Sequence, residues 1–109
     1  MNSKSILVID DNPDIGTALN VLCMLANIKC TSVLTPAEGL AKLSQQSFDL
    51  VIQDMNFTSD ITSGDEGITL FHQIREIASD MPIIVITAWT RLETAVDLVR
   101  CGFADYLAK

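Results

Sequence analysis

Two adjacent aspartates, Asp10 and Asp11, directly follow a run of apolar residues in the segment SILVIDDNPDIG. Neighbouring carboxylates repel each other where water is scarce, so a buried strand that ends in two of them calls for a neutralising cation. A third aspartate, Asp54, ends another apolar run in the segment FDLVIQDM. Mg²⁺ prefers oxygen ligands and takes one or two carboxylates together with water and a phosphate oxygen. The three aspartates therefore predict a magnesium site with room for a phosphoryl group.

Phosphoryl transfer is the chemistry that this set of residues favours. A carboxylate can attack phosphorus and form an aspartyl phosphate if the geometry is in line and the charge on the phosphoryl oxygens is neutralised. We expect Asp54 to be the nucleophile, Mg²⁺ and Lys109 to supply positive charge, and Thr87 to supply a hydroxyl group. The set contains no base that would activate a serine or a cysteine, which disfavours acyl transfer.

The elements that must position these residues are strands alternating with helices. Apolar runs typical of strands lie at residues 6–9, 28–34, 50–52, 83–86 and 103–107. Their nearly continuous apolarity predicts strands that are covered on both faces, as in an open parallel sheet with right-handed crossovers. The carboxyl ends of parallel strands meet at one edge of such a sheet, beside the point where the strand order reverses. The candidate residues all fall at that edge.

Local signals mark where the helices begin and end. Asn12 and Pro13 suit the cap and the first turn of the first helix. The stretches 35–38 and 90–93 both match the T-x-x-E capping box, so each is expected to open a helix. Gly102 stands where a left-handed residue would end the last of these helices.

Helical spacing predicts which side chains are buried. The third helix is expected to run over about residues 66–78 and to bury Phe71, Ile74 and Ile77. The expected apolar face of the first helix consists of Ile15, Ala18, Leu19, Leu22 and Ala26.

Length and composition indicate one acidic domain, residues 1–109. The chain has 49% hydrophobic residues and a formal net charge of −7, which disfavours direct nucleic-acid binding by this domain. Its three cysteines, Cys23, Cys30 and Cys101, have no C-x-x-C spacing, so we expect reduced thiols and a cytoplasmic location. The first apolar run is too short for a signal peptide or a membrane span.

Four segments, taken together and in this order, resemble the receiver domain of a two-component response regulator. They are LVIDDNPDI, FDLVIQDM, MPIIVITAW and GFADYLAK, and the likeness extends over the whole chain. The resemblance implies a flavodoxin-like, doubly wound, five-stranded parallel sheet in three α/β/α layers. It also implies a signalling domain of a phosphorelay, which assists its own phosphotransfer and dephosphorylation but is not an enzyme acting on other substrates.

The resemblance further implies a role for each acidic residue. Asp54 would accept the phosphoryl group from a sensor histidine kinase. Asp11 and Asp54 would bind Mg²⁺ directly, Asp10 would act through a water molecule, and the backbone carbonyl of Asn56 would complete the protein ligands.

The resemblance also assigns the groups that would contact the phosphoryl oxygens. Lys109 would pair with these oxygens, and the Thr87 hydroxyl and the Ala88 backbone N–H would bind the others. Tyr106 matches the switch aromatic of the family, which turns inward when the threonine moves toward the phosphate. The change of charge at the phosphorylation site would thereby shift the equilibrium between two conformations of the domain surface.

Two features depart from the usual pattern of the family. The segment after Asp54, MNFTSDITSGDEG, is longer by several residues and has no proline, which resembles receivers attached to sigma-54-type activators. The chain also ends at Lys109, where receivers usually continue into a fifth helix. We therefore expect this chain to be a receiver domain that is shortened at its C-terminus and lacks the fifth helix. An output domain, which we expect to regulate transcription, would be absent from this chain. Apolar surface left exposed in this way favours a homodimer.

Three alternative functions remain open at this point. A phosphohydrolase of the haloacid dehalogenase type would also use an aspartate nucleophile, but its second aspartate would fall at the position of Asn12. A flavodoxin-like electron carrier fits the fold, although acidic residues occupy the loop where a flavin phosphate would need donors. The third alternative is a degenerate receiver that serves only for dimerisation.

Overall fold

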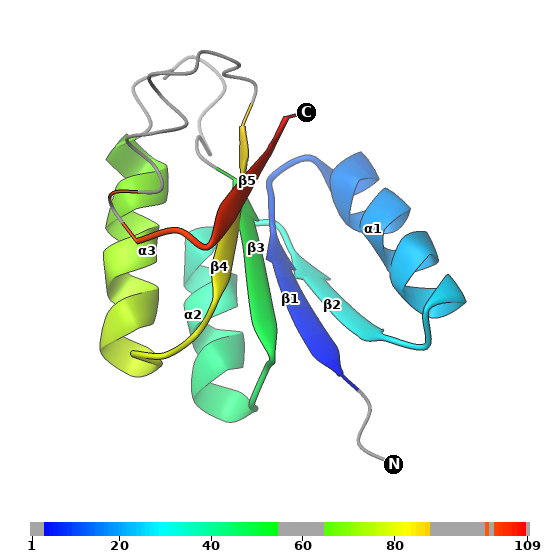
Figure 1. The fold of residues 1–109 in the computed structure, drawn as a ribbon, viewed down its shortest axis with the longest axis horizontal. Helices are drawn as coiled ribbons and strands as arrows, with labels where there is room; N and C mark the ends of the chain where they lie inside the picture. The colour runs from blue at the N-terminus through cyan, green and yellow to red at the C-terminus, as the bar shows by residue number, and fades with distance from the viewer. Residues whose placement is uncertain (1–3, 55–64, 88–99, 101, 109) are drawn as a thin grey trace.

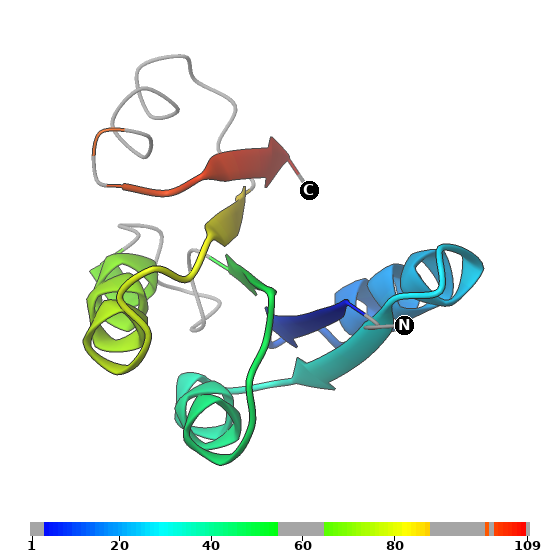
Figure 2. The same cartoon turned by 60° about the horizontal axis from the view of Figure 1, so that its bottom comes forward.

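Strands alternate with helices over residues 5–87, and five strands build a single parallel sheet. The computed structural model describes residues 4–54, 65–87, 100 and 102–108. The elements are β1 (Ser5–Ile9), α1 (Pro13–Leu25), β2 (Lys29–Val33), α2 (Pro36–Gln45), β3 (Leu50–Asp54), α3 (Asp65–Ile77), β4 (Ile83–Thr87) and β5 (Asp105–Ala108). α1 covers one face of the sheet, and α2 and α3 cover the other (Figures 1 and 2). These layers confirm the predicted α/β architecture.

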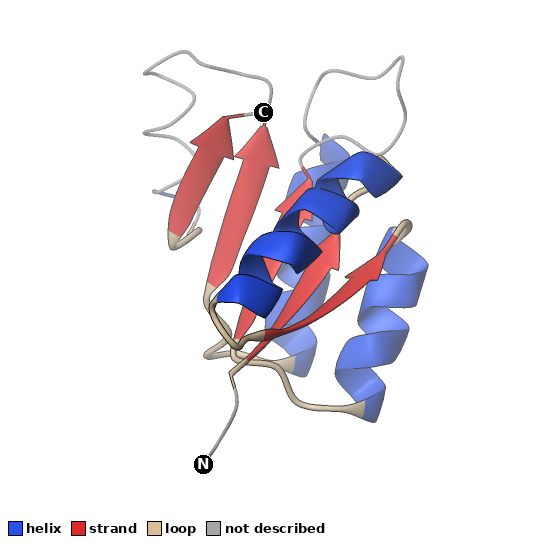
Figure 3. Ribbon diagram, turned by 90° about the vertical axis from the view of Figure 1, so that its right-hand side faces the viewer, coloured by secondary structure: helices blue, strands red, loops and turns tan. Residues whose placement is uncertain are grey.

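The order of the strands determines where a site can form. The strands lie in the order β2-β1-β3-β4-β5, and all neighbouring pairs are parallel. The chain moves outward from β1 to β2 and then returns to the other side of β1, where Ile9 pairs with Gln53 of β3. The strand order thus reverses between β1 and β3, and the strands point toward the same edge of the sheet (Figure 3). A site in an open parallel sheet forms beside this reversal.

Polar side chains cap the first two helices as the sequence predicts. Asn12 Oδ1 accepts a hydrogen bond from the Asp14 backbone N–H at 3.0 Å, and Pro13 opens α1. At α2, Thr35 Oγ1 accepts from the Glu38 N–H at 3.2 Å, and the Thr35 hydroxyl donates to Glu38 Oε1 at 3.1 Å. The second predicted capping box, residues 90–93, lies outside the described residues.

Gly102 confirms the prediction of a left-handed backbone at this position. Its φ is +110°, a conformation that residues with a side chain rarely adopt. A Cβ atom here would also lie 3.1 Å from Cζ of Phe71. The close contact and the positive φ together favour glycine.

The core lies on both faces of the sheet because successive residues of a strand point to opposite sides. Leu7 and Ile9 of β1 belong to the larger cluster, which also contains Phe71 and Ile74 of α3. Val8 belongs to the smaller cluster, which packs against residues of α1. Among the described residues, no helix is long and apolar enough to cross a membrane.

Four residues predicted to lie on apolar helix faces are exposed: Ala18, Leu22 and Ala26 at the first helix and Ile77 at the third. Leu22 is 61% exposed, whereas Cys23 is buried. Helix α1 is therefore rotated about its axis relative to the predicted orientation. Gly16 explains the rotation, because the helix packs its glycine side closely against β2: a Cβ atom at Gly16 would lie only 2.9 Å from Cβ of Ser32. Ile77 is 45% exposed because it lies at the end of α3, next to a surface pocket.

The environment of Cys30 leads to a first prediction. Burial and the neighbouring Cys23 thiol raise the pKa of Cys30 to about 11. Because the thiolate is the reactive form, alkylation of Cys30 at pH 8 should be about a hundredfold slower than that of an ordinary thiol. Peptide mass spectrometry after timed iodoacetamide treatment measures this rate, with glutathione as the reference. The Cys30 rate should still rise between pH 9 and 10, and a plateau near pH 9 would contradict the prediction.

Candidate metal and phosphoryl site

Asp10, Asp11 and Asp54 meet at the carboxyl edge of the sheet, as predicted. One carboxylate oxygen from each residue lies within 4.8 Å of the other two. Asp10 and Asp54 are each 2% exposed, whereas Asp11 is exposed. The cluster forms because β1 and β3 are parallel neighbours, so the residues at their carboxyl ends are brought side by side.

Backbone hydrogen bonds hold the first of these carboxylates in place. The Asp10 N–H donates to the carbonyl of Val33 at 3.2 Å, which extends the pairing of β1 with β2 by one residue. Asp10 Oδ1 accepts from the Asn12 N–H at 2.9 Å. This bond turns the chain at Asp11, and Asn12 then caps α1. The start of the first helix and the orientation of the Asp10 carboxylate therefore depend on the same short turn.

The donor set fits a hard divalent cation. All three candidate ligands are carboxylate oxygens, which Mg²⁺ prefers over nitrogen or sulfur. Two of the carboxylates are buried, where their mutual repulsion is least screened, so a bound cation would stabilise the folded site. The exposed carboxylate of Asp11 lies on the solvent side of the cluster.

The structure describes the backbone positions of two more predicted residues, Thr87 and Tyr106. Thr87 is the last residue of β4 and pairs with Ala108 of β5, while Asp54 pairs with Ile86 of β4. Tyr106 lies in β5 opposite Val85. The side chains of Thr87 and Tyr106 lie outside the described part of the structure, as do the residues Asn56, Ala88 and Lys109. Their predicted roles remain predictions.

Gln53 lies beside the acidic site although its position in the sequence did not predict a role there. It precedes Asp54 in β3 and is fully buried. Its side-chain amide donates to the backbone carbonyls of Asp54 and Gly67, at 3.2 Å and 2.8 Å. The available signal was a single polar residue inside the apolar run LVIQD.

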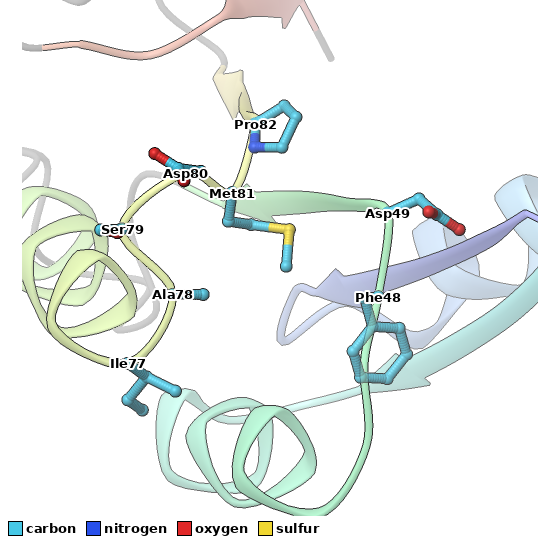
Figure 4. Close-up of a pocket in the computed structure, with 8 residues that line it drawn as sticks. All are labelled: Phe48, Asp49, Ile77, Ala78, Ser79, Asp80, Met81 and Pro82. Atoms are coloured by element: carbon cyan, nitrogen blue, oxygen red, sulfur yellow. The ribbon is translucent and has the colours of Figure 1, made fainter.

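A pocket of about 490 Å³ lies at the opposite edge of the sheet, before β3 and β4 begin (Figure 4). It is lined by Phe48–Asp49 and Ile77–Pro82. Because the aspartates follow the carboxyl ends of β1 and β3, this pocket has no part in the acidic site.

Comparison with known proteins agrees with the geometry of the acidic site. Residues 6–109 match the family described as the response regulator receiver domain. The chain belongs to this family. It is 30% identical over 107 residues to the C4-dicarboxylate transport transcriptional regulatory protein DctD of Rhizobium meliloti, and this match covers 98% of the chain but 22% of DctD. DctD is among the sigma-54 activators that the long loop after Asp54 resembled.

Solved receiver structures have the same fold. A CheY-like receiver domain protein of Methanospirillum hungatei matches with a TM-score of 0.82 and 26% identity, covering 99% of this chain and 82% of that one. The response regulator TrrA of Thermotoga maritima, solved in complex with Mg²⁺-BeF, matches with a TM-score of 0.79 and 27% identity. That match covers 97% of this chain and 86% of TrrA.

Membership of the receiver family excludes two of the three alternative functions and leaves the degenerate receiver open. A receiver domain is a phosphoacceptor in signalling and not an enzyme, which excludes the phosphohydrolase and the flavin-dependent electron carrier. The acidic cluster of Asp10, Asp11 and Asp54 is typical of the magnesium site of receivers. The family also implies a histidine kinase as partner, and relatives such as DctD are regulators of transcription.

Proposed function

We propose that this receiver accepts a phosphoryl group on the carboxylate of Asp54 from the phosphohistidine of a sensor histidine kinase. The observation that carries the proposal is the cluster of three carboxylates within 4.8 Å at the carboxyl edge of the sheet. Asp54 is suited to the nucleophilic role because it ends the strand next to the reversal of strand order.

The acidic residues would divide the binding of Mg²⁺ among them. Asp11 and Asp54 would bind the ion directly, the Asn56 carbonyl would add a third ligand, and Asp10 would hold a water ligand. The hydrogen bond from the Asn12 N–H fixes Asp10 for this role. When bound there, Mg²⁺ neutralises the carboxylates and the charge that develops on the phosphoryl oxygens.

The remaining site residues would hold the transferred group and report its presence. Lys109 would pair with one phosphoryl oxygen, and the Thr87 hydroxyl and the Ala88 N–H would bind the others. The pairing of β4 with β5 supports this assignment, because it sets Thr87 beside Ala108, the residue before Lys109. Tyr106 on the same strand would follow the movement of Thr87 and change the outer surface of the domain.

The signalling partners complete the proposal. The receiver, residues 1–109, would control a transcriptional output domain, since the relative DctD is a transcriptional regulatory protein. Its reduced cysteines fit a cytoplasmic setting, and Cys23 and Cys30 are free thiols. Association into a homodimer is supported by exposed apolar side chains near the end of α1: Val21, Leu22, Met24 and Leu25.

Intact-mass measurement after incubation with acetyl phosphate tests the proposed function. We expect one phosphoryl group to be gained in the presence of Mg²⁺ and none when the ion is chelated with EDTA, because the oxygens of the phosphoryl donor and Asp54 otherwise repel each other. A gain that is equal with and without Mg²⁺ would contradict the proposed site. If no gain occurs under either condition, a degenerate receiver that serves for dimerisation is the better account.

A further inference from the structure

Gln53 is a polar side chain in the most apolar part of the molecule. It is 0% exposed and lies in register between Ile9 of β1 and Val85 of β4, two residues of the larger core cluster. Burying an amide among apolar side chains is unfavourable unless its polar atoms are hydrogen-bonded. The position therefore needs an explanation other than packing.

Only one end of the Gln53 amide is satisfied. Nε2 donates to the carbonyl oxygen of Gly67 at 2.8 Å and to that of Asp54 at 3.2 Å. Both partners are acceptors, so the nitrogen must face them and the orientation of the amide is determined. Oε1 is left buried, and within the described part of the chain it has no hydrogen-bond partner.

This arrangement does not favour stability. A buried acceptor without a donor destabilises the folded state, and an apolar side chain of similar length would avoid that loss. Buried polar groups that reduce stability are characteristic of sites where a particular geometry is needed. The two bonds that the amide does make should therefore be the reason for its presence.

The two bonds join the acidic site to the start of a helix. Asp54 is the last residue of β3 and pairs with Ile86 of β4, and the Gln53 amide donates to its backbone carbonyl. Gly67 lies in the first turn of α3, which begins at Asp65. A single amide thus holds both ends of the segment that connects β3 to α3.

We propose that Gln53 is a positioning residue for the acidic site. By holding the carbonyl of Asp54 against the first turn of α3, it fixes the backbone that directs the Asp54 carboxylate toward Asp10 and Asp11. The inference rests on the proposed function, since it assigns Gln53 a part in the binding of Mg²⁺ and in the phosphorylation of Asp54. Outer residues that orient metal ligands commonly change metal affinity by about 10- to 100-fold.

The test compares Gln53→Met with the wild type and with Val51→Ala. Methionine keeps the length of glutamine but cannot donate, whereas Val51 is a fully buried residue of the same strand that makes no side-chain hydrogen bond. Calorimetric titration of the unphosphorylated proteins with Mg²⁺ should show about tenfold weaker binding for Gln53→Met, and acetyl phosphate should phosphorylate it about tenfold more slowly. Val51→Ala should lower the melting temperature and leave both quantities unchanged.

The outcomes separate a positioning role from a merely structural one. If Gln53→Met binds Mg²⁺ and gains the phosphoryl group as the wild type does, the inference is wrong and the proposed function stands. It is equally wrong if Val51→Ala and Gln53→Met lose affinity in proportion to their loss of stability. A wild type that neither binds Mg²⁺ nor gains a phosphoryl group contradicts the proposed function, and Gln53 then has no metal site to position.

A measurement on the wild type covers the case in which Gln53→Met does not fold. Coupling between two sites is reciprocal, so if the Gln53 bonds support Mg²⁺ binding, Mg²⁺ must also strengthen those bonds. We expect the Gln53 side-chain NH₂ to exchange slowly with solvent in NMR spectra and to exchange more slowly still when Mg²⁺ is added. Exchange that is unchanged by saturating Mg²⁺ would overturn the inference.

Discussion

Replacement of Asp54 by asparagine is expected to abolish phosphorylation by acetyl phosphate. Asparagine has nearly the same shape but lacks the negatively charged oxygen that attacks phosphorus. The substitution also removes one of three carboxylates that lie within 4.8 Å of each other, so the free energy of unfolding should not fall. Intact mass spectrometry measures the first effect, and urea denaturation measures the second.

Asp14→Asn is the matched control for Asp54→Asn. It makes the same change of charge in the first turn of α1, but Asp14 is exposed and is not a member of the acidic cluster. This variant should gain the phosphoryl group as the wild type does. A phosphoryl group that peptide mapping of Asp54→Asn locates on another residue would show that the nucleophile had been assigned wrongly.

Replacement of Phe71 by alanine is expected to cause a larger loss of stability than any of the other substitutions. The ring is buried, and its centroid lies 4.4 Å from that of Phe103, while the Arg75 guanidinium lies 4.9 Å from its centre. Removing a buried phenylalanine side chain costs about 3–5 kcal/mol, through lost burial and the cavity left behind. This is a large share of the roughly 5–15 kcal/mol that is typical of a domain.

The loss should extend beyond the cavity itself. Arg75 donates hydrogen bonds to the carbonyls of Ser79, Met81 and Gly102, so it connects the end of α3 with the loop before β4 and the residue before Phe103. Without the Phe71 ring, the guanidinium loses the surface on which it rests. Urea denaturation monitored by circular dichroism gives the free energy of unfolding. Gln73→Ala, on the exposed side of the same helix, should change it by less than about 0.5 kcal/mol.

A loss below about 1 kcal/mol for Phe71→Ala would contradict the packing around this ring, because the core would have to close completely over the missing side chain. Phosphorylation of this variant below its unfolding transition should continue, since Phe71 is not among the acidic residues. We therefore expect Asp54→Asn to abolish phosphoryl transfer without loss of stability, and Phe71→Ala to lower stability without loss of phosphoryl transfer.

The elements and their order could be predicted because their signals are local. Apolar runs indicated the strands, and the caps at Asn12 and Thr35 depend on side chains within three residues of the backbone they satisfy. The acidic cluster could be predicted as well. Once β1 and β3 are parallel neighbours, the residues that follow them must lie at the same edge, whatever the details of packing.

Other features could not be predicted because they depend on contacts between distant segments. The rotation of α1 follows from the close approach of Gly16 to Ser32 in β2, which turns Leu22 to solvent. Ile77 has the spacing of a core residue but lies where α3 ends beside the pocket, so no neighbour covers it fully. Helical periodicity gives the relative directions of side chains but not the position at which the helix meets the sheet.

The sequence alone determined the class of fold and the acidic chemistry, because strand ends and carboxylates can be read along the chain. Only the tertiary structure revealed the role of Gln53. Its two bonds join Asp54 to Gly67, which are thirteen positions apart by their residue numbers, through a buried amide that looks like an interruption in the apolar run LVIQD. A buried polar side chain can either destabilise the fold or join two segments, depending on which hydrogen-bond partners surround it. Tertiary packing determines those partners.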